Sequence, residues 1–268
     1  MLSIKGLCAA LVLWLWLVVP AHATTPSVVG NVYCNTAAST CTGNFSSGVS
    51  AGSSILVVGA YGAYSGTITL SVADSAGNCT TYPTTHDSVN SPAFHTQFFA
   101  VCATTTTALT TSSTITVTTT GATGLFNVGM VQVGSANALA FPAGVSSFVS
   151  GSGTSGTSLP TMPTTPALTW SSEDAYALVT WYNGHTTDTI SWGNGFSAVA
   201  CWPASASNRP SVCLGRATVS SGTVTPAVTV TNTGAGYIAS AIMIANSGTM
   251  SCIVPGGLMM GAGGGRRC

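Results

Sequence analysis

The chain has four histidines that could bind a metal: His22, His86, His95 and His185. His86 and His95 lie nine residues apart, with Asp87 beside the first, in a stretch that we expect to be a loop. Zinc and calcium sites have recognisable ligand spacings, and these residues lack them. The sequence therefore predicts no metal site and no cofactor here.

His22 has a second interpretation, which depends on where a signal peptide would be cleaved. Cleavage after Ala21 would make His22 the first residue of the mature chain. Its amine and imidazole, with the imidazole of His86 or His95, would then form a copper brace like that of secreted lytic polysaccharide monooxygenases. Cleavage after Ala23, which we expect, removes His22, so copper is kept only as an alternative.

The carboxylates do not suggest a hydrolase. They are Asp74, Asp87, Glu173, Asp174 and Asp188. A glycosidase needs two carboxylates on either side of one sugar bond. Glu173 and Asp174 are adjacent, so on a strand they would face opposite ways, and we expect them in a turn. Only a fold that brings Asp74 near Asp188 would provide such a pair.

One short segment, Gly48-Val49-Ser50-Ala51-Gly52, matches the G-x-S-x-G pattern of a nucleophile elbow. That elbow needs a strand before the serine and a helix after it, whereas an apolar strand-like run follows here. We interpret the segment as a turn. The residues considered so far form no coherent catalytic set, so the sequence favours a protein that is not an enzyme.

Aromatic residues gather in the second half of the chain: Trp170, Trp181, Tyr182, Trp192 and Trp202. Aromatic rings pair a large apolar surface with specific geometry, and exposed ones can stack on sugar rings. Alternate residues of a strand face opposite ways, so some of these rings belong to a core. We expect Trp181 in the core and keep Trp192 and Trp202 as candidate glycan contacts.

Threonines alternate at Thr114, Thr116 and Thr118. On a strand, this alternation would place a row of hydroxyls and methyls on one sheet face, as ice-binding or self-associating surfaces require. Threonine is also a favourable uncharged residue on the solvent side of a strand. The row alone does not decide between these interpretations.

Charged residues make up only 4% of the sequence, against about 25% in an average domain. Lys5 is the only lysine, and the arginines are Arg209, Arg216, Arg266 and Arg267. So few cations exclude nucleic-acid binding through phosphate neutralisation. The expected partner is neutral: a glycan, a polymer surface or another copy of the chain.

Residues 1–23 have the order of a signal peptide. Lys5 precedes an apolar run at 7–19, and Ala21-His22-Ala23 is a small-x-small cleavage site. The run is shorter than the roughly 20 residues of a membrane span, and no later stretch is long and apolar enough for one. We expect a secreted or cell-surface protein without a transmembrane segment.

Residues 53–130 and 175–242 follow the same order of strand-like runs, turns and cysteines. Period-two runs rich in Val, Ile, Thr and aromatics alternate with Gly, Asn, Pro and Ser clusters, which is typical of strands. The predicted fold class is all-β: an antiparallel β-sandwich or jelly roll built from two duplicated halves.

The expected halves are 24–150 and 167–247, separated by a Gly/Ser/Thr/Pro connector at 151–166. A Gly-rich tail at 248–268 follows, which we interpret as a flexible end. Because each half supplies only about five or six strands, we prefer two halves of one larger sandwich with a shared core over two separate sandwiches.

Eight of the nine cysteines lie beyond the predicted signal peptide, and an even number in an exported chain indicates disulfides. The repeat predicts the pairs Cys79–Cys102 and Cys201–Cys213. Cys34 and Cys41 are expected to pair because only a short loop separates them, which leaves Cys252 to pair with Cys268.

The runs at 48–58, Asp74-Ser75-Ala76-Gly77-Asn78 and 151–155 resemble secreted bacterial and phage-associated β-sandwich modules of largely uncharacterised function. The resemblance covers most of the mature chain. Its motifs are turn and strand signatures, so it implies fold and export but no reaction. The many cysteines depart from that pattern and favour a free-standing, disulfide-stiffened domain.

These observations favour a non-catalytic exported β-sandwich that acts by contact, as cell-surface, matrix or appendage structure, or in adhesion. The alternative is a carbohydrate-binding or carbohydrate-active protein. It would use Trp192 or Trp202, or copper at His22.

Overall fold

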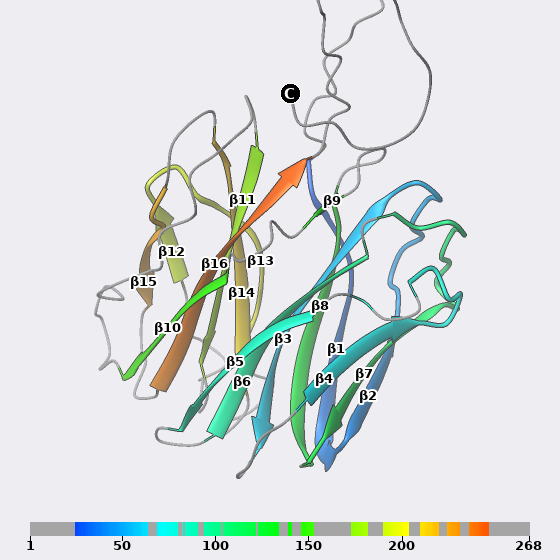
Figure 1. Cartoon of the computed structure of the whole chain (residues 1–268), viewed down its shortest axis with the longest axis horizontal. Coiled ribbons are helices and arrows are strands. Elements are labelled where there is room, and N and C mark those ends of the chain that lie inside the picture. The colour runs from blue at the N-terminus through cyan, green and yellow to red at the C-terminus, as the bar shows by residue number, and fades with distance from the viewer. Residues whose placement is uncertain are drawn as a thin grey trace, which may run out of the picture.

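Runs of alternating residues pair as β-strands in the computed structural model of the chain (Figure 1). The structure describes residues 25–63, 69–79, 82, 84–90, 94–102, 104–121, 123–133, 139–140, 146–152, 173–181, 190–203, 210–219, 224–230 and 236–246. Within them it has sixteen strands and no helix, which confirms the all-β class. A helix able to cross a membrane is accordingly not found in this part of the chain.

The first half contains two antiparallel sheets. Five strands pair in the order β1-β8-β3-β6-β5 and three in the order β2-β7-β4. The bounds of the larger sheet are β1 Ser27–Ala38, β8 Gly124–Val133, β3 Ser54–Ala63, β6 Phe94–Cys102 and β5 Thr84–Asn90. Those of the smaller sheet are β2 Thr40–Asn44, β7 Thr114–Thr120 and β4 Thr69–Asp74.

The second half also contains one large and one small sheet. The main path of the large sheet is β10-β16-β11-β14-β13, β9 pairs with β16, and β12 pairs with β15. The bounds are β9 Leu139–Ala140, β10 Ser146–Ser152, β11 Glu173–Trp181, β12 Ile190–Gly193, β13 Ser197–Trp202, β14 Ser211–Val219, β15 Ala227–Val230 and β16 Gly236–Asn246.

The strand order of the two large sheets is the same. β10, β16, β11, β14 and β13 take the places of β1, β8, β3, β6 and β5, and β12 and β15 take those of β4 and β7. The strands of the two halves therefore follow one another in the same order along the chain and across the large sheets. Because β10 pairs within the second sheet, the expected boundary at residue 150 is wrong, and residues 151 and 152 belong to a strand.

The four sheets are stacked in layers, with three hydrophobic cores between them. The sheet of β12 and β15 lies at one end of the stack and the sheet of β2, β7 and β4 at the other (Figure 1). Phe98 belongs to the core under the three-stranded sheet. Leu56 and Leu178 belong to the core between the two large sheets. Trp181 and Val228 belong to the core under the two-stranded sheet. The halves share a core as expected, but each also has its own, so the molecule is two small sandwiches packed face to face.

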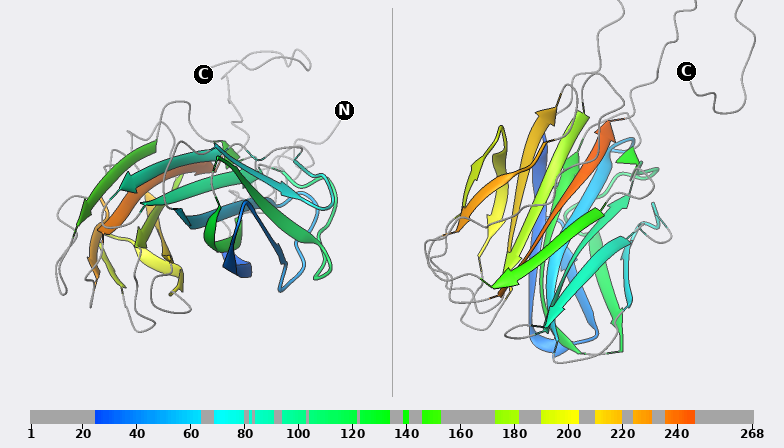
Figure 2. Two further views of the ribbon diagram at one scale, coloured as in Figure 1. Left: turned by 90° about the horizontal axis from the view of Figure 1, so that it is seen from below. Right: turned by 60° about the vertical axis from the view of Figure 1, so that its left-hand side comes forward.

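The contact between the large sheets is only partly symmetric. β3 faces its counterpart β11, and the contact of β13 with β1 matches that of β10 with β5, because β10 corresponds to β1 and β13 to β5. In addition β14 faces β3 and β8, and β16 faces β5, without matching contacts of the same extent. The two halves are therefore offset from the arrangement of an isologous interface, in which one surface patch meets its own copy. Figure 2 shows the yellow and orange strands of the second half beside the blue and cyan strands of the first.

Trp202 is the largest side chain of the second half that enters this contact. It is 7% exposed and belongs to the core between the large sheets. Its ring lies on Gly129, where a Cβ atom would overlap it, so glycine is needed for the close approach. Asn127 donates from Nδ2 to the carbonyl oxygens of Trp202 and Pro210, each at 2.9 Å.

Three disulfides join the described cysteines in the pairs that we expected: Cys34–Cys41, Cys79–Cys102 and Cys201–Cys213. The fourth expected pair, Cys252–Cys268, lies outside the described residues.

The expected equivalence of two of these disulfides is wrong. Cys102 stands opposite Ile55, near the start of β3. Cys213 stands opposite Val179, near the end of β11, which is the counterpart of β3. Strand order is therefore the same in the two halves, whereas the cysteines fasten opposite ends of corresponding strands.

Replacing Trp202 with alanine tests whether its burial between the halves supports the fold. We expect Trp202→Ala to lower the free energy of unfolding by about 3 to 5 kcal/mol, because it leaves a large cavity in a packed core. Chemical denaturation of the oxidised protein measures the change. Val28→Ala is the control, since Val28 is 41% exposed and should cost less than about 0.5 kcal/mol. Equal, small effects would contradict the packing described.

Candidate binding face

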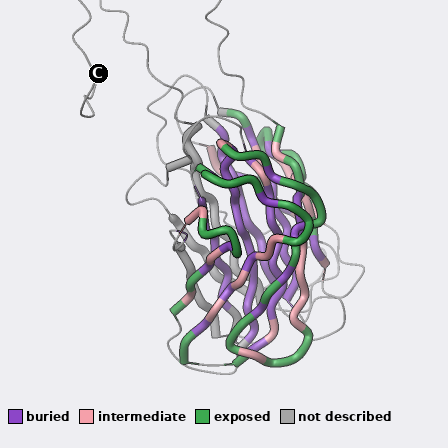
Figure 3. Tube along the Cα trace, turned by 90° about the vertical axis from the view of Figure 1, so that its right-hand side faces the viewer, coloured by how far each residue is buried: buried purple, intermediate pink, exposed green. Residues whose placement is uncertain are grey.

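The outward side of the three-stranded sheet carries small uncharged side chains, and we call it the threonine face. Along β2, β7 and β4, inward residues are mostly buried and alternate with outward residues that are exposed or half-buried, as Figure 3 shows from the side of this sheet. The face consists of Thr40, Thr42, Asn44, Thr69, Ser71, Ala73, Thr114, Thr116, Thr118 and Thr120.

These residues form a grid because the register aligns them across the strands. Thr116 lies between Thr42 and Ala73, and Thr118 lies between Thr40 and Ser71. Neighbours are roughly 4.8 Å apart across strands and roughly 6.6 Å apart along them. The hydroxyls of Thr42 and Thr116 share a hydrogen bond at 3.1 Å.

The grid is held in place from beneath. Ile115 and Val117 of β7 are fully buried in the first core, as is Val72 of β4. On β2 the inward positions are the buried Cys41 and Gly43. A Cβ atom at Gly43 would overlap the Val32 side chain, so glycine lets β2 approach β1 closely.

A disulfide fastens the edge strand of the face. Cys34 on β1 bonds to Cys41 on β2, with Cα atoms 5.7 Å apart. β2 has five residues and pairs only with β7 among the described strands. The disulfide links this short edge strand to the five-stranded sheet.

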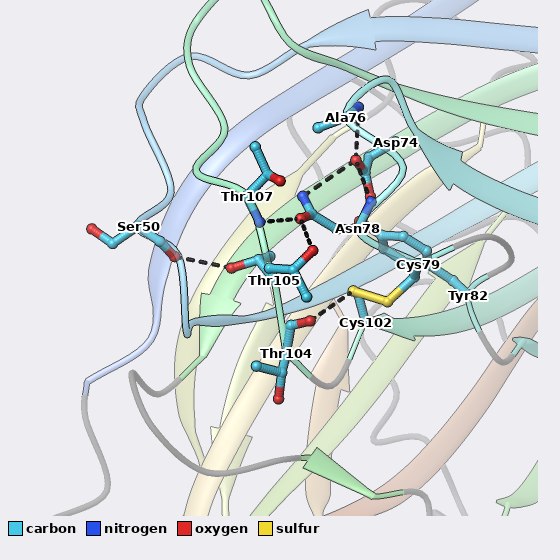
Figure 4. The surroundings of a disulfide bond; sticks show 11 residues. Ser50, Asp74, Ala76, Asn78, Cys79, Tyr82, Cys102, Thr104, Thr105 and Thr107 are labelled. Atoms are coloured by element: carbon cyan, nitrogen blue, oxygen red, sulfur yellow. Dashed lines mark hydrogen bonds between the residues drawn. A yellow bond between two sulfur atoms is a disulfide. The ribbon is translucent and has the colours of Figure 1, made fainter.

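The turn after β4 closes one end of the face (Figure 4). Asp74 accepts hydrogen bonds at Oδ1 from the Ala76 amide, 2.9 Å, and from the Asn78 amide, 3.3 Å. Its Oδ2 accepts from the Tyr82 hydroxyl at 3.0 Å, inside the core. A left-handed Gly77, φ 68°, completes the turn. The Asp-Ser-Ala-Gly-Asn motif therefore has a structural role at this end.

The same turn is tied to the loop before β7. Asn78 Oδ1 accepts the Thr107 amide at 2.6 Å and the Thr106 hydroxyl at 3.3 Å. The next residue, Cys79, is bonded to Cys102 at the end of β6. Figure 4 shows these contacts converging beside the disulfide. Together they tie the end of β4 to the loop that leads into β7 and to the five-stranded sheet.

The G-x-S-x-G segment is a turn, as expected. The Ser50 carbonyl accepts the Ser53 amide at 3.2 Å, and Gly52 has a φ of 85°. The same carbonyl accepts the Thr105 hydroxyl at 3.0 Å. β3 follows this turn, so the serine is not on the strand-to-helix elbow that a nucleophile needs.

The tryptophans that the structure describes, Trp181, Trp192 and Trp202, lie on the core side of their strands. Trp181 is fully buried, as expected. Trp202 is covered by the first half, so its proposal as a glycan contact is wrong. Trp192 packs against the third core, with its ring on Gly215 and stacked against Phe196 at a centroid distance of 6.2 Å. Its indole Nε1 is buried, which leaves only part of the ring to solvent.

Two of the histidine candidates lie on neighbouring strands of the five-stranded sheet. His86 lies in β5 and His95 in β6, so the expected loop is wrong. No group of three or more His, Cys, Asp or Glu side chains that could hold a metal occurs among the described residues. His22, His185 and Asp188 lie outside those residues.

Glu173 and Asp174 begin β11 and do not form the expected turn. Asp174 is 5% exposed and accepts a charged hydrogen bond from Arg216 of β14 at 2.7 Å. The Thr218 hydroxyl donates to the same oxygen at 3.1 Å. This carboxylate is neutralised by its partner and is a structural ion pair.

Burial raises the pKa of four described tyrosine hydroxyls, those of Tyr33, Tyr61, Tyr82 and Tyr176, and most strongly those of Tyr82 and Tyr176. Desolvation raises the pKa of Tyr82, and the negative charge of Asp74 adds to the shift. Desolvation also raises the pKa of Tyr176, where the charge of Asp174 adds and that of Arg216 opposes. Both phenols are therefore strongly disfavoured as phenolates in the folded protein.

Comparison of the chain with protein-family models, with curated proteins and with solved structures finds no match. The resemblance to secreted bacterial and phage-associated modules stays a prediction.

The raised tyrosine pKa values predict a loss of stability in alkali. An unfolded tyrosine ionises near pH 10, whereas the folded phenols stay protonated, so the free energy of unfolding should fall above pH 10. The slope is about 1.4 kcal/mol per pH unit for each such tyrosine. Denaturation between pH 9 and 11 measures it. Tyr82→Phe and Tyr176→Phe should each flatten the slope, and an unchanged slope in both variants would contradict these shifts.

Proposed function

We propose that the protein is an exported, non-catalytic structural protein that acts by contact of its threonine face with a neutral partner. The observation that carries this proposal is the three-stranded grid of small hydroxyl side chains. The predicted signal peptide and the three disulfides support export.

The charges of the described residues support a neutral partner. The acidic side chains whose positions are described are Asp74 and Asp174, and both point inward and are less than 10% exposed. Arg216 is paired with Asp174. The threonine face itself has no charged residue. Long-range electrostatic steering is therefore weak, and recognition depends on hydrogen bonds and van der Waals contact.

The carbohydrate alternative has less support at its proposed residues. Stacking on a sugar ring needs an exposed aromatic face. Trp202 is buried between the halves, and Trp192 lies against the third core. A neutral glycan remains a partner that the hydroxyls of the threonine face could bind without such stacking.

A charged, bulky substitution in the centre of the grid tests this proposal. We expect Thr116→Arg to reduce retention at least tenfold, which corresponds to about 1.4 kcal/mol of lost contact. Retention is measured by co-sedimentation with microcrystalline cellulose, with chitin and with the surface of the producing cells. In parallel, sedimentation velocity measures binding to other copies of the protein.

Thr25→Arg is the matched control, because Thr25 is exposed before β1 and lies outside the grid. It should behave like the wild type in each assay, and both variants should keep the wild-type melting temperature. Equal retention of the two variants would refute a role for the face. Release of soluble product from either polysaccharide would refute a non-catalytic role.

A further inference from the structure

The second half has a smaller counterpart of the threonine face. β12 and β15 correspond to β4 and β7, and their register pairs Ser191 with Thr229 and Gly193 with Ala227. Between these pairs, Trp192 and Val228 point inward to the third core. Alternation therefore turns the Ser191–Thr229 and Gly193–Ala227 pairs outward. We call these four residues the second face.

The two faces match in position as well as in residue type. The Ser191–Thr229 pair takes the place of Ser71–Thr118 in the first half. Both sets are small and uncharged. Since the small sheets are the first and last of four stacked layers, the faces lie at opposite ends of the molecule (Figure 1).

We propose that copies of this chain assemble end to end, with threonine face on threonine face and second face on second face. This inference rests on the proposed function and names its partner as a second copy. Contacts of like with like are self-complementary, and each closes on itself as a dimer. A molecule with one such contact at each end continues into a chain of copies.

Near-neutrality favours a second copy as the partner. A net charge far from zero keeps proteins monomeric through mutual repulsion, whereas this chain without the predicted signal peptide has four arginines and five carboxylates, a formal net charge of −1. Neither face contains a charged residue. Short side chains also let two sheets approach closely, as small residues do in tightly packed sheet interfaces.

The size of the faces sets the strength of the contact. The threonine face has strands of five, seven and six residues and covers roughly 300 Å² per copy, from strand spacing and rise. The four residues of the second face cover less. A stable interface buries about 800 Å² per partner. Each contact is therefore weak, and chains of copies form only at high protein concentration, as on a crowded surface.

Sedimentation velocity of the full-length oxidised protein, from about 10 µM to about 1 mM, tests the inference with three variants. Wild type should form species larger than dimers as concentration rises. Thr116→Arg blocks one end and Thr229→Arg the other, so each should stop at dimers. The double variant should stay monomeric. Thr25→Arg is the control and should behave as the wild type, and unchanged melting temperatures show that the variants are folded.

Three results would overturn this inference. One is a wild type that stays monomeric throughout, and another is single variants that assemble as far as the wild type. The third is a single variant that is fully monomeric, because like-with-like contacts leave one end active. If self-assembly fails while Thr116→Arg still loses retention on cellulose, chitin or cells, the proposed function stands and only the second copy as partner is refuted.

Discussion

The structure depends on burying both sides of the five-stranded sheet. On β3, the successive residues Ile55 and Leu56 are each fully buried, but one enters the core of the first half and the other the core between the halves. A sheet with two apolar sides needs a cover on each. The second half is that cover for one side, so loss of the contact between halves would expose an apolar surface on both.

Paired polar groups align this contact. Gln97 accepts the Thr180 hydroxyl at 3.2 Å across the halves, the Tyr33 hydroxyl donates to the Pro203 carbonyl at 3.0 Å, and Asn127 reaches two carbonyls of the second half. Apolar packing tolerates sliding, whereas buried hydrogen bonds are lost if the sheets shift. These hydrogen bonds fix the position of one large sheet on the other. The small outer sheets, which pack on the large ones, are thereby fixed relative to each other, and so are the faces they carry.

The strands are predictable from the sequence because the alternation of apolar and polar residues is a local property. Which strands pair with each other, and which face of a strand is covered, depends on residues far away in the sequence and is not predictable in this way. The residues of β10 do not show that β16 is its neighbour, so the half to which β10 belongs is not predictable from the sequence. Alternation also cannot tell which side of a strand is covered when both are, so the sequence does not show that Trp202 is buried. Only the β7 row of the threonine face was recognised. On β2 the inward residues, Cys41 and Gly43, are too small to show the usual apolar alternation.

The joining of the two halves in one chain has a consequence for how the protein can vary. In a homodimer every substitution appears twice, once on each side of the axis, so a ring as large as Trp202 would need room at two places. Here each half carries its own residues, and Gly129 meets that ring once. Covalent linkage therefore frees each half to change alone, so that one molecule can evolve two ends that differ in width and chemistry around an offset, asymmetric centre.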